Sequence, residues 1–210
     1  MKIRSLIMCG IICTGFTAYS QESEISKSTG KIGIFYSSFG DNELVRSEDL
    51  IGGPSYSGDK FYTLGVNYLY PFTQWLDFQT GLVYSKHQIT ITPNIVHPYV
   101  PGVDYAPAKP YNEDLSVISI PVGVQLNFFK YLFVNGGFSL DFDTGSSNSF
   151  DDQTGIGLQV GAGVQYEFRN RISLFINPYA KGHSIVSFSS QDNRQRLMEA
   201  GVKIGVMLRL

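Results

Sequence analysis

Residues 196–210 alternate between apolar side chains and polar or small ones at every second position. A period of two is typical of a β-strand with unlike faces, because successive side chains of a strand point to opposite sides. The apolar members occupy the even positions: Met198, Ala200, Val202, Ile204, Val206, Leu208 and Leu210. This pattern predicts a strand that separates an apolar environment from a polar one.

Related patterns fill seven earlier stretches, and most of them keep the same parity. The central even positions carry no charge, as hydrocarbon requires, because an Arg or Lys near the midplane of a bilayer costs about 2–4 kcal/mol. We predict eight strands, at 31–39, 60–71, 75–92, 115–129, 131–143, 155–168, 171–188 and 196–210. Long connections alternate with short ones. The predicted fold is all-β, an eight-stranded antiparallel transmembrane β-barrel with short periplasmic turns and longer extracellular loops.

Alternation alone does not say which face is inside, because a soluble lipocalin-like ligand-binding barrel has eight strands with the apolar face inward. In this chain the odd face is rich in Gly, Ser, Asn and Gln, which suits a narrow lumen. Aromatic residues of the even face gather near the strand ends, as at membrane interfaces. They are Tyr68, Tyr70, Phe128, Tyr166 and Phe168 at the turn end and Tyr36, Tyr62, Tyr84 and Phe142 at the loop end. The membrane barrel is therefore favoured over the soluble one.

The first 20 residues have the parts of a secretory signal. Lys2 and Arg4 give a positive start, and the apolar run 6–16 is too short to span a bilayer as a helix. Ala18 and Ser20 form a small-x-small cleavage site. Both cysteines lie in this segment, so we expect no disulfide in the mature protein. The predicted organisation is a signal peptide, 1–20, and an outer-membrane β-barrel domain, 21–210, in the cell outer membrane of a Gram-negative envelope.

The charge of the mature chain is mildly acidic. Without Lys2 and Arg4 the 16 basic residues fall to 14 against 18 acidic residues, a formal charge of −4. Nucleic-acid binding would require a basic face, so no nucleic-acid partner is expected. After the signal, no stretch approaches the ~20 consecutive apolar residues of a transmembrane helix.

Two prolines lie inside predicted strands. Pro121 and Pro178 each remove a donor from the hydrogen-bond ladder, and a closed barrel has no free edge to accommodate them. We therefore expect a β-bulge or a local widening of the strand pairing at both positions.

Charged residues recur on the odd, inward face. The predicted lumenal network comprises Lys31, Asp77, Asp141, Glu167, Arg171, Lys181, Glu199, Lys203 and Arg209. Eight strands leave an interior just filled by side chains, so these charges must pair or hold water. For Lys203, near mid-depth, we expect an acidic or amide partner, with Glu167, Asp77 and Asp141 as the acidic candidates. A proton or small-ion pathway is the alternative to a purely structural network, and the strand number excludes a porin-sized channel.

Catalytic and metal-binding arrangements have weak support. His87 and His183 with Asp141 or Asp143 would make a metal site, but they come from different strands without ligand-like spacing. His183 and Ser184 are neighbours, so a regular strand places them on opposite faces. We expect no catalytic residue, no cofactor and no metal. A lipid-modifying outer-membrane barrel enzyme remains the alternative.

The long connection 93–114 is the most distinctive loop. Five prolines stiffen it, and a loop of more than ~12–15 residues without its own structure is usually functional or disordered. Its candidate contact residues for a partner are His97, Tyr99, Tyr105 and Tyr111. Tyrosine offers a large amphipathic contact area at low entropic cost. We expect contact with outer-membrane lipid through the barrel and with an extracellular or envelope protein through this loop.

Three segments resemble the PorT-like outer-membrane β-barrel family of Gram-negative bacteria. They read LDFQTGLVYSKHQ at 76–88, LSVISIPVGVQLNFF at 115–129 and FRNRISLFINPYAKG at 168–182. The resemblance implies an integral outer-membrane protein, in some members an accessory of secretion, and it supplies no catalytic residues. The predicted function is therefore non-enzymatic: an envelope or surface-interaction role, or an accessory role in secretion.

Overall fold

The computed structural model describes residues 29–46, 54–93, 109–145, 151–188 and 195–210. The expected signal peptide, 1–20, and the greater part of the 93–114 connection lie outside the described residues. Those two predictions therefore stay predictions.

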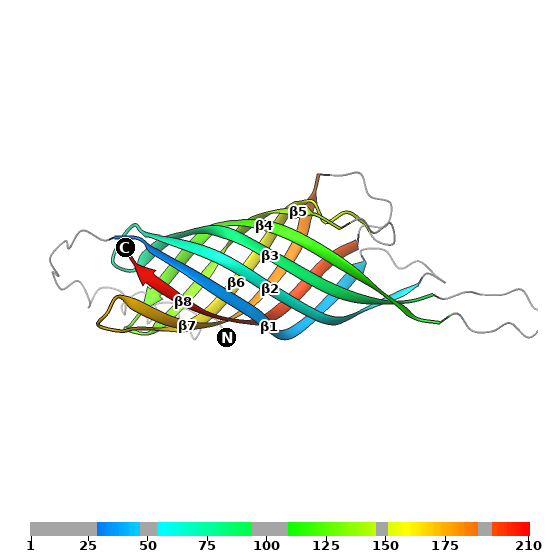
Figure 1. Cartoon of the computed structure of the whole chain (residues 1–210). Coiled ribbons are helices and arrows are strands. Elements are labelled where there is room, and N and C mark those ends of the chain that lie inside the picture. Colours follow the sequence, from blue (N-terminus) through cyan, green and yellow to red (C-terminus); the bar gives the residue numbers. More distant parts are fainter. Residues whose placement is uncertain (1–28, 47–53, 94–108, 146–150, 189–194) are drawn as a thin grey trace, which may run out of the picture.

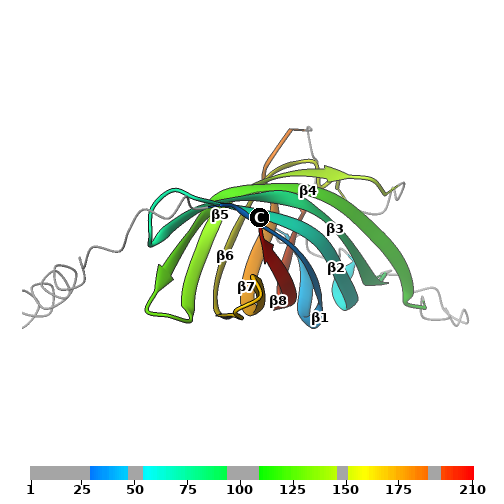
Figure 2. The ribbon, with the colours of Figure 1, turned by 60° about the vertical axis from the view of Figure 1, so that its left-hand side comes forward.

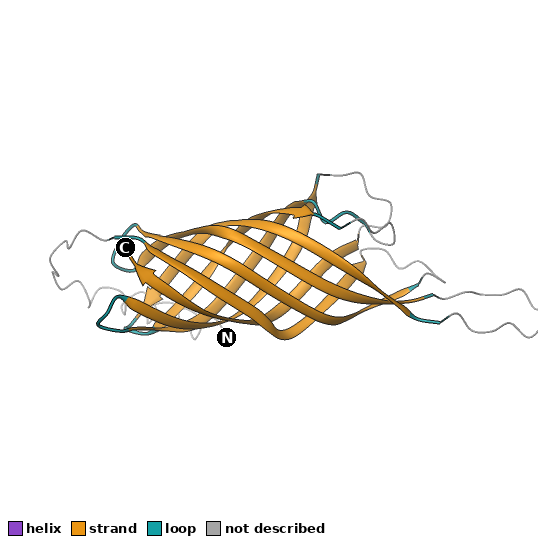
Figure 3. Ribbon diagram, in the orientation of Figure 1, coloured by secondary structure: helices purple, strands orange, loops and turns teal. Residues whose placement is uncertain are grey.

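Eight strands form a closed antiparallel barrel in which each strand pairs with its neighbours in the chain and β1 pairs with β8 (Figures 1 and 3). The strands are β1 (Lys31–Arg46), β2 (Ser55–Pro71), β3 (Leu76–Thr92), β4 (Tyr111–Phe128), β5 (Leu132–Asp143), β6 (Gly155–Glu167), β7 (Ile172–Ser187) and β8 (Gln195–Arg209). Short turns join β2 to β3, β4 to β5 and β6 to β7 at one end, here called the turn end. The other end is the loop end. The predicted all-β barrel is confirmed.

The described part of the chain contains no helix that is both long and apolar enough to cross a membrane.

β1, β2 and β4 are longer at the loop end than the alternation predicted. The pairing of β1 with β8 shifts by one residue between Tyr36 and Phe39, and that of β2 with β3 shifts between Gly58 and Phe61. A β-bulge of this kind inverts the parity of all residues beyond it. The apolar pattern of even positions therefore ends at the bulge although the strand continues.

The outward face is apolar and the inward face is mainly polar, as the parity predicted. Val160 is 55% exposed and Leu82 is 56% exposed, whereas the odd-numbered Ser119 and Gln125 are buried. The aromatic residues Tyr36 and Tyr166 are exposed on the outer surface. This apolar belt with its aromatic residues is the surface of a barrel that lies in lipid.

Glycines on the inward face make room for aromatic rings. A Cβ added at Gly65 would lie 2.4 Å from the ring of Phe35, and one added at Gly205 would lie 2.4 Å from the ring of Phe175. Each glycine therefore lets a ring from an adjoining strand lie flat against its backbone. The glycine-rich odd face is a consequence of packing large side chains into a narrow lumen.

Pro121 and Pro178 cause no bulge, so that part of the expectation was wrong. Pro121 pairs with Ser139 and Pro178 pairs with Val202 without a change of register. On the other side of Pro121, the pairing of β4 with β3 is interrupted between the pairs Thr80–Val122 and Val83–Ser119. On the other side of Pro178, the pairing of β7 with β6 is interrupted between the pairs Gly161–Tyr179 and Val164–Ile176. The missing N–H is thus accommodated by a local gap on one side of the strand. The register shifts lie instead in the middle of β1 and in the loop-end parts of β2 and β7.

Candidate functional site

The lumen is arranged in layers, which the inward residues of β8 mark in order. From the turn end these are Arg209, Met207, Lys203, Glu199 and Leu197. Each belongs to a different environment: a salt-bridge group, an apolar cluster, an amide layer, a charged cluster and a second apolar cluster. The candidate functional chemistry is therefore divided by depth.

At the turn end, Glu167 holds two cations. Its Oε2 lies 3.0 Å from Nζ of Lys31, and its Oε1 lies 2.7 Å from Nη2 of Arg209. Near them Asn127 donates a 2.8 Å hydrogen bond to Asp77. These groups line an open recess of about 330 Å³. Three of the proposed network residues thus form one group that is separate from the rest.

Arg171 lies apart from the lumen. It belongs to the turn between β6 and β7, its backbone φ is 67°, and it is exposed. The left-handed conformation turns the residue out of the strand path, so the odd-face parity no longer applies to it. Its carbonyl accepts the backbone N–H of Arg209.

Lys203 lies in the lumen near mid-depth without a carboxylate partner. Nζ is 3.5 Å from Oε1 of Gln159 and 4.0 Å from the centroid of the Tyr179 ring. A second ring, that of Phe35, lies 5.3 Å away. The amide oxygen of Gln159 is one of the two kinds of partner expected. The described structure gives Lys203 no ion pair with the acidic candidates Glu167, Asp77 and Asp141. The reason is position: Glu167 and Asp77 lie at the turn end, and Asp141 is held by another lysine.

That lysine is Lys181, in the charged layer nearer the loop end. Its Nζ lies 3.1 Å from Oδ1 of Asp141 and donates a 2.7 Å hydrogen bond to Oγ of Ser119. Asp141 is fully buried and Lys181 is 5% exposed. The two charges therefore neutralise each other inside the barrel.

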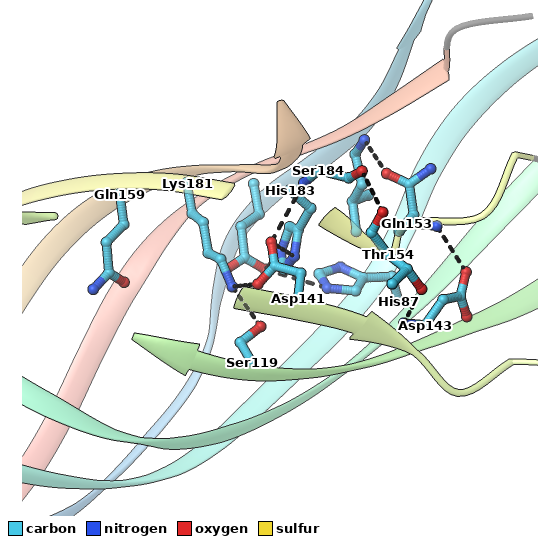
Figure 4. A network of polar contacts seen from close by, with 12 residues as sticks. His87, Ser119, Asp141, Asp143, Gln153, Thr154, Gln159, Lys181, His183 and Ser184 are labelled. Atoms are coloured by element: carbon cyan, nitrogen blue, oxygen red, sulfur yellow. Dashed lines mark hydrogen bonds and ion pairs between the residues drawn. The ribbon is translucent and has the colours of Figure 1, made fainter. Parts of the chain in front are cut away.

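Two histidines complete this layer (Figure 4). Nδ1 of His183 lies 3.3 Å from Oδ2 of Asp141, and its Nε2 lies 3.7 Å from Oε2 of Glu199. Nε2 of His87 lies 3.3 Å from the same Glu199 oxygen. The two imidazoles meet edge to face with centroids 5.6 Å apart. Side chains from β3, β5, β7 and β8 thus converge on one buried point.

Ser184 points inward together with His183, so the expectation of opposite faces was wrong. Its φ is 46°, and the register of β6 with β7 shifts between Ile156 and Leu158. This bulge turns two successive side chains to the same side. Oγ of Ser184 donates to the carbonyl of Thr154 at 3.2 Å, and Ser119 accepts from Lys181. Neither hydroxyl is placed as a nucleophile activated by an imidazole.

An apolar cluster closes the lumen beyond the histidines. Its members are Leu44, Ile89, Ile91, Leu115, Val117 and Leu197, with Tyr56 packed against them. The side-chain amide of Gln153 donates to the carbonyls of Asp151 and Gln195 beside this cluster. Asp143 accepts backbone N–H groups of Gly145 and Gln153 and is not part of the histidine group.

Toward the turn end a second apolar cluster fills the lumen. It consists of Phe35, Leu69, Val83, Phe133, Phe175 and Met207. Between the two clusters lies a cavity of about 20 Å³ in the amide layer. That space is about the size needed for a single water molecule. In the described residues the lumen is therefore packed shut at two levels.

At the loop end β3 and β4 form a projecting hairpin (Figures 1 and 2). β4 pairs with β3 from Tyr111 onward, but its pairing with β5 begins at Val117. On the outer face an ion pair of 2.7 Å joins Lys86 to Asp114, and beyond it Thr90 donates to Asn112 at 2.9 Å. The outward surface changes from apolar to polar at this point, so the hairpin end stands outside the apolar belt. Of the proposed contact residues, Tyr111 is described and exposed, whereas His97, Tyr99 and Tyr105 lie outside the described residues.

The sequence missed some members of the lumenal site. Asn42, whose amide lies 3.4 Å from Nδ1 of His87, follows the bulge of β1 and so has even parity. Tyr179 was not expected to cover Lys203. The candidate metal set of the sequence joined the histidines to Asp141 or Asp143, whereas the carboxylate between both histidines is Glu199. Which carboxylate lies between the histidines depends on the register of the strands, and the alternation of side chains along one strand does not give that register.

Comparison with known proteins gives the following matches. A family model described as outer membrane protein beta-barrel domain matches residues 8–207. No curated protein matches the chain. The structure is similar to that of the outer membrane protein OprG from Pseudomonas aeruginosa, with 13% identity, a TM-score of 0.52, and coverage of 87% of this chain and 96% of that one. Ail, the attachment invasion locus protein of Yersinia pestis, is 16% identical with a TM-score of 0.40, over 86% of this chain and 99% of that one.

Proposed function

This chain belongs to the outer membrane protein beta-barrel domain family, and we propose that it is a non-channel member that binds an extracellular or envelope partner through its loop end. It is an outer-membrane protein, so the turn end faces the periplasm and the loop end faces outward. The observation that carries the proposal is the β3–β4 hairpin, which projects beyond the apolar belt with a polar outer surface.

A closed lumen supports a role at the ends of the barrel. Two apolar clusters fill the interior on either side of the charged layer. Side chains that are packed to this density resist rearrangement, so a permanent path for solutes has no room. The useful surfaces of such a barrel are its lipid face and its two ends.

The projecting hairpin offers a rigid surface for recognition. Its inward side contributes Ile89, Ile91 and Leu115 to the apolar cluster inside the lumen at the loop end. These contacts fix the hairpin to the barrel. Its outward side is polar, and Tyr111 is 45% exposed at its end. An anchored tyrosine-bearing hairpin can bind a partner with little loss of conformational entropy.

A second candidate is an accessory role in secretion, with a partner on the periplasmic side. The PorT-like resemblance implies such a role, and the recess at the turn end provides a surface for it. Phe129 is 92% exposed beside the recess, which is lined by Lys31, Glu167 and Arg209. An exposed aromatic side chain at the margin of a charged recess is a plausible anchor for a protein contact.

Photocrosslinking in intact cells tests both candidates. A photoreactive amino acid replaces Tyr111 at the loop end, Phe129 at the turn end, or Val160 on the lipid face as a matched control. We expect the Tyr111 variant to form one reproducible protein adduct, identified by mass spectrometry, that the Val160 variant lacks. An adduct at Phe129 alone would replace the first candidate by the second, and adducts at neither position beyond those at Val160 would contradict both.

A non-enzymatic role fits the serine geometry. The buried hydroxyls of Ser184 and Ser119 are engaged with Thr154 and Lys181. A lipid-modifying enzyme of the serine type would require a hydroxyl directed at an imidazole and open to lipid. The histidine layer is instead enclosed by packed side chains.

A further inference from the structure

We propose that His87, His183 and Glu199 bind one divalent transition-metal ion, Zn²⁺ or a cation of similar preference, inside the barrel. The ligand atoms are Nε2 of each histidine and one carboxylate oxygen, which all lie within 4.8 Å of one another. Both histidine side chains are fully buried, and that of Glu199 is 2% exposed. Two imidazoles with one carboxylate form a ligand set that zinc commonly uses.

The two separations between Glu199 and the histidine nitrogens are close to those around a tetrahedral ion. Bonds of about 2.1 Å place two ligands of such an ion about 3.4 Å apart. The Glu199 oxygen lies 3.3 Å from Nε2 of His87 and 3.7 Å from Nε2 of His183. None of these three atoms makes a hydrogen bond within the described structure. Three buried polar atoms that converge without hydrogen bonds would gain a common partner from one ion.

The other nitrogen of each imidazole faces a polar side chain, as in known metal sites. Nδ1 of His183 lies 3.3 Å from Oδ2 of Asp141 but without the geometry of a hydrogen bond, and Nδ1 of His87 lies 3.4 Å from the side-chain amide of Asn42. Either amide atom of Asn42 can occupy this position, because the oxygen and nitrogen exchange by a simple flip. Such contacts keep the hydrogen on Nδ1 and direct the lone pair of Nε2 inward.

Ring contacts and ion pairing fix the same arrangement. Phe61 stacks on His87 with centroids 5.6 Å apart and an interplanar angle of 14°. Lys181 is occupied by Asp141 and Ser119, so its ammonium does not fill the space between the histidines. Three protein ligands leave the fourth position of a tetrahedral ion to a water molecule.

The ion would cross-link the barrel from inside. His87 belongs to β3, whereas His183 and Glu199 belong to the adjacent strands β7 and β8 on the opposite wall. The link would brace the region where the bulge interrupts β7. The apolar cluster inside the lumen at the loop end covers the histidine layer, so the ion enters most readily while the barrel folds.

The test uses the purified full-length mature protein, refolded in detergent micelles with and without Zn²⁺ and then freed of unbound metal. We expect one retained Zn²⁺ per chain by elemental analysis. The thermal midpoint should rise by roughly 10 °C when Zn²⁺ is ~1,000-fold above its Kd. Co²⁺ in place of Zn²⁺ should give the visible absorption of a four-coordinate site.

Matched variants distinguish this site from casual binding. Glu199→Gln, His87→Gln and His183→Gln should each lose the retained ion and the thermal shift, whereas His97→Gln, which alters the remaining histidine of the sequence, should keep both. Each variant is first shown to fold by its heat-modifiable migration, and a variant that does not fold is replaced by the Ala substitution at the same position. Absence of retained metal in the wild-type protein, or binding that depends on His97 alone, would overturn the proposal. The crosslinking results at Tyr111 and Phe129 are independent of this outcome.

Discussion

Val160→Arg is expected to abolish insertion of the folded barrel into bilayers. Val160 lies near the middle of β6, is 55% exposed and belongs to the apolar outer belt. An arginine at the bilayer midplane costs about 2–4 kcal/mol, a large part of the stability of a small domain. Val124→Arg, on the outer face of β4 where Val124 is 43% exposed, should have the same effect. Folding into lipid vesicles, followed as the fraction of protein with heat-modifiable migration, measures the loss.

Two control substitutions separate charge from packing and outside from inside. Val124→Ala keeps an apolar residue on the lipid face and should fold normally. Gln125→Ala changes the neighbouring lumenal residue, which is buried and donates a 2.9 Å hydrogen bond to Asn127. Its cost should be only about 1 kcal/mol. If Gln125→Ala prevented insertion while Val124→Arg did not, the two faces of the barrel would be reversed.

Asp141→Asn is expected to cost about 3–5 kcal/mol of unfolding free energy, because it leaves the buried ammonium of Lys181 without its counter-charge. Lys181 is 5% exposed, and it also donates a hydrogen bond to the Ser119 hydroxyl. Denaturant unfolding in micelles measures the change. A chelator is present throughout, so that metal bound by the neighbouring histidines does not contribute.

The double variant Asp141→Asn/Lys181→Met tests whether the loss comes from the stranded charge. Removing both charges should restore most of the stability lost in the single variant, since a buried pair often contributes little net stability. A double variant as unstable as Asp141→Asn alone would mean that Asp141 acts through His183 or Ser184 rather than through Lys181.

The strand number, the faces and the membrane location could be predicted because they depend on a local pattern. A period of two needs no knowledge of distant residues, and an apolar even face such as that of β4 and β6 has few explanations other than lipid. The same reasoning placed Lys203 and Asp141 on the inward face. What a residue touches across the lumen depends on strand tilt and register, which no single strand encodes.

The errors have the same physical origin. A bulge adds one residue and inverts parity, which concealed the loop-end parts of β1 and β2 and turned Ser184 inward beside His183. Register also decided that Lys181, rather than Lys203, pairs with Asp141. Of the two expectations for Pro121 and Pro178, the bulge is absent, whereas the local widening agrees with the gaps in the ladder on one side of each proline.

Ion conductance through planar bilayers tests the central claim, an outer-membrane barrel with a closed lumen that acts through its ends. The purified folded protein is added to the bilayer, insertion is verified by protease protection in matched vesicles, and a general porin in the same bilayer verifies that openings are detectable. The two apolar clusters and the packed charged layer predict no step-like conductance. Regular, reproducible opening steps from the wild-type barrel would contradict the closed lumen and favour the alternative of an ion pathway.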